Sequence, residues 1–221
     1  MPSEMEIAWL GHSSFRIKGK SGTVITDPYE DSIGLKFPRN LTADIVTVSH
    51  AHSDHNHTTA VKGDFTTFSA PGEYEIGGIS LVGVATYHDA KKGQERGKNT
   101  AFVIEQEKIR LFHSGDLGHT LSREQLNIVG PIDILFLPVG GIYTIGPQEA
   151  VEVINQLEPT VIIPMHYHMP GLADTFAKLA PVDDFLKALG VKSQPQPKYT
   201  VTHDQLPEEQ TVIILEPKTS P

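Results

Sequence analysis

The chain has 221 residues, 38% of them hydrophobic, which is enough to build the core of one large domain. Its 27 acidic and 18 basic side chains give a formal net charge of −9, which disfavours nucleic acid and anionic membranes as partners. The sequence contains no cysteine, so disulfides and thiolate metal sites are excluded. Any bound metal must therefore have nitrogen and oxygen ligands.

No targeting or membrane segment is evident in the sequence. The N-terminal MPSEMEIAWLGHSS lacks a basic stretch followed by an apolar one, and no run of about eighteen apolar residues occurs. We therefore expect no membrane span and a cytoplasmic location. Because no repeat, low-complexity tract or long linker divides the chain, we also expect a single domain over residues 1–221.

The first half of the chain is predicted to form short strands separated by turns. The segment ADIVTVS, residues 43–49, is a nearly continuous apolar run of the kind found in strands buried on both faces. Turns are predicted at Gly77-Gly78 and at Gln106-Glu107-Lys108. The other predicted strands lie within residues 5–10, 14–18, 22–29, 64–71, 72–87 and 100–116.

The second half is predicted to alternate strands and helices. Ser122 and Gln125 have the spacing of a capping box, which predicts a helix that ends at Gly130. A second helix follows Gly146, with Pro147 in its first turn, and a third occupies DDFLKALG, residues 183–190. The second helix is expected to direct Ala150, Val151, Ile154 and Leu157 towards the core. Buried strands within 132–139 and 160–168, and two last strands within 199–217, complete a pattern of sheets covered by helices.

The loop that follows the apolar strand at 43–49 is rich in metal-ligand side chains. It contains His50, His52, Asp54 and His55 in the pattern H-x-H-x-D-H. In an extended segment, residues two apart project to the same side, so His50 and His52 can converge on one ion while Asp54 and His55 serve a second. A polar loop whose histidines only cap a helix is the alternative, which this dense pattern disfavours.

Four residues of one loop cannot complete two metal sites, so this hypothesis requires further ligands at other strand ends. His88 follows the predicted strand GISLVGVATY, Asp116 lies in LFHSGDLGH, and His166 follows TVIIPM. Each is a histidine or carboxylate placed directly after a predicted strand. The sequence therefore predicts a site assembled from several strand ends.

The ordered set HAHSDH, YHD, HSGDLGH and PMHYH resembles the metallo-β-lactamase superfamily of binuclear hydrolases. The segments WLGHSSFRI and LPVGGIYTIGPQEA, with the Asp27-Pro28 turn, most resemble its branch of short hydrolases related to ascorbate-6-phosphate lactonases. The resemblance spans residues 5 to about 170. It implies an α/β fold, a four-layer αββα sandwich with two mixed β-sheets flanked by helices.

The resemblance also implies a ligand set for two divalent metal ions. A carboxylate that bridges two cations offsets their repulsion, and neutral imidazoles suit Zn²⁺, which we expect, with Mn²⁺ or Fe²⁺ as alternatives. Water bound by both ions would supply a hydroxide nucleophile, and Asp54 would act as the catalytic residue that orients it and passes its proton to the leaving group. The implied ligands are His50, His52 and His88 on the first metal, Asp54, His55 and His166 on the second, and Asp116 between them.

Other residues near these motifs have weaker signals. Asp27 resembles the superfamily aspartate that holds the histidine loop and fixes imidazole tautomers. His12 and His168 are expected to contact substrate at the rim, and a solvated loop is favoured over an anion contact for KKGQERGK, residues 91–98. The Gly140-Gly141 segment is predicted to be a tight turn that could line the pocket rather than a nucleotide loop. His57, His113, His119 and His203 are predicted to lie outside the ligand set.

We expect a metal-dependent hydrolase of a small-molecule ester-like bond, with lactones or phosphoesters ahead of β-lactams, because one Trp offers few anchors for a bulky substrate. The first alternative is a superfamily nuclease or phosphodiesterase, which would need a basic track. The second is a non-catalytic metal-binding module, which would typically have lost a ligand. A flavodiiron-type oxidoreductase would need Glu in place of His52 and an added flavin domain. The oligomeric state is left open.

Overall fold

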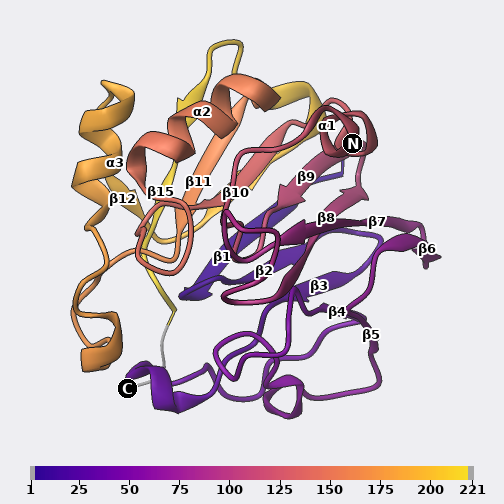
Figure 1. The fold of residues 1–221 in the computed structure, drawn as a ribbon. Coiled ribbons are helices and arrows are strands. Elements are labelled where there is room, and N and C mark those ends of the chain that lie inside the picture. Colours follow the sequence, from indigo (N-terminus) through magenta and orange to yellow (C-terminus); the bar gives the residue numbers. More distant parts are fainter. Residues whose placement is uncertain (1–2, 219–221) are drawn as a thin grey trace.

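Two β-sheets packed face to face form the centre of the computed structural model, which describes residues 3–218 (Figure 1). The N-terminal sheet has six strands in the order β13-β1-β2-β3-β4-β5. The second sheet has seven strands in the order β14-β11-β10-β9-β8-β7-β6, and β12 and β15 form a separate short pair. Both large sheets mix parallel and antiparallel pairs, as the resemblance implied.

The N-terminal sheet changes from antiparallel to parallel pairing at β3. Strands β13, β1, β2 and β3 pair antiparallel, whereas β3, β4 and β5 are parallel. The two parallel neighbours β3 and β4 therefore release their C-terminal residues at the same edge. The strand bounds are β1 (Met5–Gly11), β2 (Ser14–Lys18), β3 (Thr23–Thr26), β4 (Ile45–Thr47), β5 (Thr66–Phe68) and β13 (Tyr199–Val201).

The second sheet combines two hairpins with a parallel half. Strands β6 to β9 pair antiparallel, and β9, β10, β11 and β14 are parallel. The predicted turns are confirmed: Gly77, Gly78, Glu107 and Lys108 all have positive φ, the conformation of tight hairpin turns. The bounds are β6 (Gly72–Ile76), β7 (Ile79–Tyr87), β8 (Lys98–Gln106), β9 (Ile109–His113), β10 (Ile134–Pro138), β11 (Val161–Met165) and β14 (Thr211–Val212).

The C-terminal segment differs from the prediction of two last strands. It forms three short strands, β13, β14 and β15 (Ile214–Leu215), and β15 pairs with β12 (Pro195–Gln196). Between β14 and β15, Ile213 still donates its backbone N–H to Ile162 O, at 2.9 Å. Residues 211–215 therefore split between two pairings instead of continuing as one strand.

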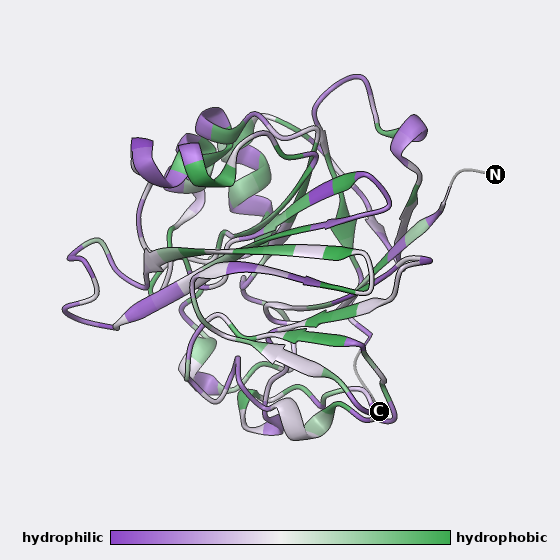
Figure 2. Ribbon diagram, turned by 90° about the vertical axis from the view of Figure 1, so that its right-hand side faces the viewer, coloured by the Kyte–Doolittle hydropathy of each residue, from purple (hydrophilic) through white to green (hydrophobic). Residues whose placement is uncertain are grey.

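The main hydrophobic core lies between the two sheets. Buried side chains of both sheets meet there, and Figure 2 shows the apolar residues concentrated on the stacked strands. Phe15 of β2 and Phe136 of β10 pack across the interface with ring centroids 4.5 Å apart. Because the sheets share this core, the strand ends on one sheet keep a fixed position relative to those on the other.

The α-helices lie on the outer side of the second sheet (Figure 1). The bounds are α1 (Arg123–Val129), α2 (Pro147–Leu157) and α3 (Val182–Leu189). The predicted capping box of Ser122 and Gln125 is confirmed, as are the C-terminal glycines of α1 and α3. The prediction that Val151 faces the core was wrong, since Val153 is buried and Val151 is only half-buried. The buried face of α2 consists of Ala150, Val153, Ile154 and Leu157, and Val151 lies at the edge of this face.

The outer face of the N-terminal sheet has a different cover. Three 3₁₀ helices, η1 (Asp31–Ile33), η2 (Thr58–Ala60) and η3 (Asp174–Phe176), lie there with their flanking loops. They enclose a second cluster of buried side chains that includes Tyr29, Val46 and Phe176. The αββα sandwich is thus confirmed, with short helical turns and loops as its fourth layer. Within residues 3–218, no helix combines the length and the apolar character needed to cross a membrane.

Removing the aromatic contact between the sheets should weaken the whole sandwich. We expect Phe136→Ala to lower the free energy of unfolding by about 3–5 kcal/mol, because a fully buried ring is replaced by a cavity. Urea denaturation followed by the fluorescence of Trp9, which is buried, measures this change. Ile128→Ala, at a position that is 48% exposed, is the control and should change stability by less than about 0.5 kcal/mol. Equal losses in both variants would contradict this placement of the core.

Candidate metal centre

The side chains predicted as ligands come from both sheets and meet at one edge of the sandwich. The loop after β4 contributes a continuous group of them. Single residues follow β7, β9 and β11 of the other sheet. Strand ends hold these side chains in place because the strands themselves are fixed by the core. The residues are His50, His52, Asp54 and His55 after β4, His88 after β7, Asp116 after β9 and His166 after β11.

Within residues 3–218, these side chains form three overlapping groups whose ligand atoms lie within 4.8 Å of one another. The first group is His50, His52 and His88. The second is His12, Asp54, His55 and His166. The third joins His50 and His55 to Asp116. The structure therefore brings all seven predicted ligands together and adds His12.

The Asp116 carboxylate lies between the first two groups. Its Oδ2 is 3.1 Å from His88 Nε2, 3.2 Å from His55 Nε2 and 3.3 Å from His166 Nε2. One oxygen of this carboxylate therefore faces rings of both groups. The backbone N–H of Asp116 donates to Asn99 Oδ1 at 3.0 Å, which fixes the turn that carries it.

Gly115 allows this close approach. A Cβ at this position would lie 2.5 Å from both Asn99 Oδ1 and Ser49 Cβ, and its φ of +57° is in the left-handed region. Any side chain here would push the Asp116 turn away from the histidine loop. Gly115 of HSGDLGH is therefore required because a side chain does not fit there.

Several buried polar atoms of the cluster have no hydrogen-bond partner among the described residues. They are His55 Nε2, both ring nitrogens of His166, Asp116 Oδ1 and His12 Nδ1. Buried polar atoms in native proteins are nearly always paired, so several unpaired ones within one cluster call for an explanation. Imidazole nitrogens and carboxylate oxygens are the donors that Zn²⁺, Mn²⁺ and Fe²⁺ take in proteins. The residues present therefore fit a pair of such cations.

Asp27 fixes the histidine loop from below. Its Oδ2 lies 2.9 Å from His55 Nδ1 and accepts from Ser49 Oγ at 2.7 Å, and its Oδ1 accepts from the Ser49 N–H at 2.8 Å. Ser49 Oγ also lies 2.9 Å from His50 Nδ1. A carboxylate on Nδ1 keeps the proton on that nitrogen and directs the lone pair of Nε2 towards the centre.

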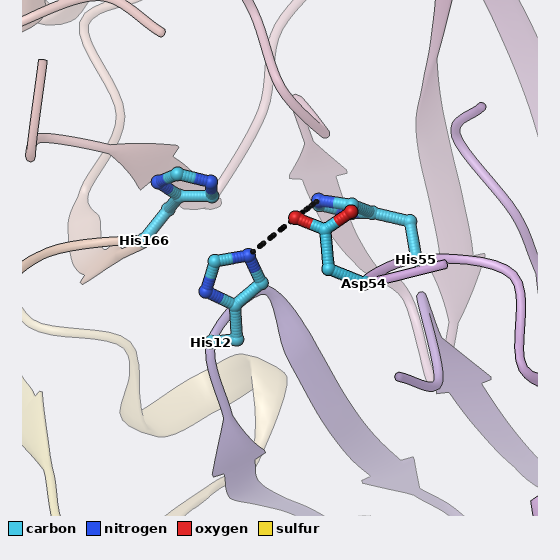
Figure 3. Close-up of side chains that lie close together, drawn as sticks. All are labelled: His12, Asp54, His55 and His166. Atoms are coloured by element: carbon cyan, nitrogen blue, oxygen red, sulfur yellow. Dashed lines mark hydrogen bonds and ion pairs between the residues drawn. The ribbon is translucent and has the colours of Figure 1, made fainter. Parts of the chain in front are cut away.

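His12 occupies a different position from the one predicted. Its side chain is fully buried, and its Nε2 is 3.2 Å from Asp54 Oδ2, which in turn is 3.5 Å from His55 Nε2. Figure 3 shows Asp54 between these two rings, with His166 facing the same space. The prediction of His12 at the substrate rim is therefore corrected: it lies beneath the site and holds Asp54.

Backbone strain coincides with the site. His12, Asp27 and His166 directly follow strands and have φ values of 53°, 40° and 50°. Few residues other than glycine adopt this region, although Asp and His do so more readily than most. Such conformations persist only where the surrounding structure enforces them, and they cluster at functional sites.

Burial and mutual charge shift the pKa values of the cluster in different directions. Burial lowers the pKa of His50 to about 3 and that of His12 to about 4. Burial alone would raise the pKa of Asp116, but His166 and His55 outweigh it and hold this pKa well below its usual range. Burial opposes protonation of His55, yet Asp116 and Asp54 raise its pKa well above the ordinary value. The two carboxylates thus favour a positive charge at this position, which a bound cation would supply.

A cavity of about 520 Å³ opens above the cluster. His52, Asp54, His88, Asp116 and His166 line it. Sequence reasoning missed part of its wall, in particular Ser32, Ile33, Arg96, Thr175 and Phe176. Only the basic character of residues 91–98 gave a signal for Arg96. Most of this loop is exposed, as predicted for a solvated loop, and Arg96 is partly buried against the cavity. Tyr143 also lines the cavity, consistent with the pocket-lining role considered for the Gly140-Gly141 segment.

The remaining histidines lie away from the cavity. His168 is exposed and does not line it, so the predicted rim contact is corrected. His113 Nε2 lies 2.8 Å from Ser13 O, and His119 Nε2 accepts from the Tyr87 N–H at 3.1 Å. His57 is 3.8 Å from Glu30, and His203 lies beside Asp204. None of these five belongs to the ligand groups found in the described part of the chain.

Comparisons with known proteins agree with this arrangement. Residues 6–166 match the sequence profile of the beta-lactamase superfamily domain. The chain is 29% identical to a UPF0173 metal-dependent hydrolase of Thermococcus onnurineus, over 86% of this chain and 94% of that protein. It is 30% identical to the corresponding hydrolase of Thermoplasma acidophilum, over 74% and 84%. A solved structure from Thermotoga maritima, assigned to the metallo-β-lactamase superfamily, superposes with a TM-score of 0.78 at 40% identity, covering 97% of this chain and all of that one.

The chain belongs to the metallo-β-lactamase superfamily, as the sequence motifs indicated. Its similarity to the hydrolases of Thermococcus and Thermoplasma extends over most of both chains, so the same basic activity applies to it. It is a metal-dependent hydrolase.

The contact between Asp27 and His55 should control metal affinity. In Asp27→Asn the amide NH₂ would donate to His55 Nδ1, which moves the ring proton to Nε2, the nitrogen that faces the cluster. We expect metal affinity to fall about 10- to 100-fold, as measured by competition with a chelator. Asn accepts positive φ readily, so the backbone at this position is not strained further.

Asp64→Asn is the matched control, because Asp64 is exposed and distant from the cluster. It should leave metal affinity unchanged. Unchanged affinity in Asp27→Asn, with the protein still folded by circular dichroism, would show that Asp27 does not orient a ligand.

Proposed function

We propose that this hydrolase cleaves a small-molecule ester-like bond, a lactone or a phosphoester, at a site for two metal ions. The observation that carries this proposal is the position of Asp116 Oδ2, within 3.1–3.3 Å of ring nitrogens that belong to both ligand groups. A carboxylate so placed, at the floor of a cavity open to substrate, supports a shared ligand rather than two unrelated metal sites.

The ligand assignment follows the two groups. We assign His50, His52 and His88 to one ion, Asp54, His55 and His166 to the other, and Asp116 to both. Zn²⁺ is our first choice because most of these ligands are imidazoles, and the name of the Thermotoga maritima relative also proposes a zinc-dependent hydrolase. Mn²⁺ or Fe²⁺ would suit the carboxylates equally well.

Two such ions, when bound, lower the pKa of a coordinated water towards neutrality and polarise the oxygen of the bond under attack. Asp54 has the contacts of a proton acceptor at this site. Burial alone would raise the pKa of Asp54, but His55 and His12 outweigh it and keep the carboxyl ionised. His12 holds Asp54 from beneath, and the Asp54 side chain remains 18% exposed to the cavity. The ionised carboxylate can therefore accept a hydrogen bond from that water and orient it, and we assign to Asp54 the passing of the water's proton to the leaving group.

The cavity favours a small molecule over a nucleic acid. Its volume of about 520 Å³ lies within the range of sites for small ligands. Arg96 is the single Arg or Lys among the described residues that line it, whereas binding of a phosphodiester backbone requires a row of basic side chains. The formal net charge of −9 acts in the same direction.

Metal content tests the two-ion assignment. We expect about two equivalents of metal in protein purified without chelator, and less than about one in His50→Ala and in Asp116→Asn, because each variant removes a ligand from the cluster. Elemental analysis by mass spectrometry measures this. His203→Ala, at a half-exposed site outside the cluster, should retain the full content. Less than about one equivalent in the unmodified protein, unchanged in both cluster variants, would rule out the binuclear site.

A substrate screen tests the activity. We expect hydrolysis of at least one lactone or phosphoester, loss of that activity on chelation, and recovery on addition of Zn²⁺ or Mn²⁺. Phosphomonoesters, phosphodiesters, lactones, thioesters and a labelled oligonucleotide form the panel. Cleavage of the oligonucleotide alone would favour a nuclease, and no turnover by protein that holds both ions would favour a non-catalytic module.

A further inference from the structure

Arg96 has no role in the proposed metal chemistry, although its side chain lines the same cavity as Asp54 and Asp116. It lies in the loop between β7 and β8, only a few residues after His88. Its guanidinium is permanently charged, unlike the imidazoles around it. A fixed cation beside a reactive centre is a candidate for binding part of the substrate.

The backbone of this loop is held in place by Asp89. This side chain is only 5% exposed, and its two carboxylate oxygens accept four backbone N–H groups. One of them is the N–H of Arg96, at 2.8 Å, and the others belong to Lys91, Gly93 and Glu95. Asp89 directly follows His88. The position of Arg96 is therefore tied to the end of strand β7 that carries a predicted ligand.

Tyr143, which also lines the cavity, supports the guanidinium. The Arg96 guanidinium carbon lies 5.6 Å from the centroid of the Tyr143 ring, within the range of a cation–π contact. The Tyr143 hydroxyl donates to Thr175 O at 2.8 Å, and the Tyr143 carbonyl oxygen is 3.1 Å from His88 Nδ1. Both the hydroxyl and the backbone of Tyr143 are thus held in place. A cation–π contact uses none of the guanidinium N–H groups as conventional hydrogen-bond donors, so they stay available to a ligand.

The ion pair that Arg96 forms within the protein is weak. Its Nη1 is 3.8 Å from Glu95 Oε2, and both side chains are about a third exposed or more. The other oxygen of Glu95 accepts from Lys91 Nζ at 2.7 Å, a much closer contact. Exposed ion pairs of this length contribute little to stability. The guanidinium is therefore able to bind an anion that enters the cavity.

We infer that Arg96, supported by Tyr143, binds an anionic group of the substrate, so that the hydrolase acts on a small ester or lactone that also bears a carboxylate or phosphate. The guanidinium fork matches such oxyanions with two parallel hydrogen bonds. In a protein of net charge −9, a local cation also offsets the repulsion of an anionic substrate. The ester or lactone part of this inference rests on the proposed function; the anion subsite does not.

Matched pairs of substrates test the subsite by kinetics. One pair is 4-nitrophenyl acetate and mono-4-nitrophenyl succinate, and the other is gluconolactone and its 6-phosphate. We expect the metal-loaded protein to prefer the anionic member of at least one pair. Arg96→Gln should lower kcat/KM for that member about 10- to 100-fold, chiefly through KM, and change the neutral member less than about twofold. Which pair responds distinguishes a carboxylate from a phosphate.

Two further variants separate recognition from a loss of structure. Arg96→Lys keeps the charge without the fork and should recover part of the preference. Lys98→Gln removes one positive charge from an exposed position two residues away and should leave both members unchanged. Equal loss on the charged and neutral members in Arg96→Gln, or no loss on either, would overturn the subsite.

A binding measurement tests the subsite without turnover. Calorimetry on metal-loaded protein compares acetate with succinate, glutarate and adipate, which carry a second carboxylate at three different distances from the first. We expect at least one dicarboxylate to bind about tenfold or more tightly than acetate, and Arg96→Gln to abolish that difference. Equal affinities in both proteins would refute the subsite. A screen in which no ester is hydrolysed would instead contradict the proposed function alone.

Discussion

The structure depends on how the buried Asp116 carboxylate is accommodated among imidazoles. Its side chain is almost fully enclosed, and three ring nitrogens lie within 3.1–3.3 Å of one of its oxygens. A buried charge is costly unless it is paired and hydrogen-bonded. Asn99 fixes its backbone, and Asp27 fixes the facing ring of His55. These contacts hold the polar cluster in a geometry that suits cations, and bound cations would account for the nitrogen and oxygen atoms that lack other partners.

The sandwich supplies the rigidity that this cluster needs. The histidine loop follows β4 of one sheet, whereas the residues that complete the site follow β7, β9 and β11 of the other. A shift of one sheet against the other would separate them. The shared aromatic core, with Phe15 packed on Phe136, resists such a shift. Core packing and metal binding are thus connected through geometry, although neither Phe15 nor Phe136 lines the cavity.

The residues around Arg96 in the cavity wall are also connected to the predicted ligand His88. The Tyr143 ring contacts Arg96, and the Tyr143 carbonyl oxygen contacts the ring of His88. Asp89, the residue after His88, accepts the backbone N–H of Arg96. A substrate group bound by Arg96 would therefore rest on elements that also position a ligand. Binding energy gained away from the reacting bond can align that bond with the catalytic groups.

The sequence by itself determined the family, the order of strands and helices up to the C-terminal segment, and the residues of the cluster apart from His12, because strand ends and ligand side chains leave local patterns. HAHSDH follows an apolar strand, and the capping box of Ser122 marks α1. Only the tertiary structure decided what the other residues do. It buried His12 beneath Asp54, left His168 outside the cavity, and placed Arg96 over Tyr143. Those roles arise from contacts between residues about 40 or more positions apart, which no local spacing encodes.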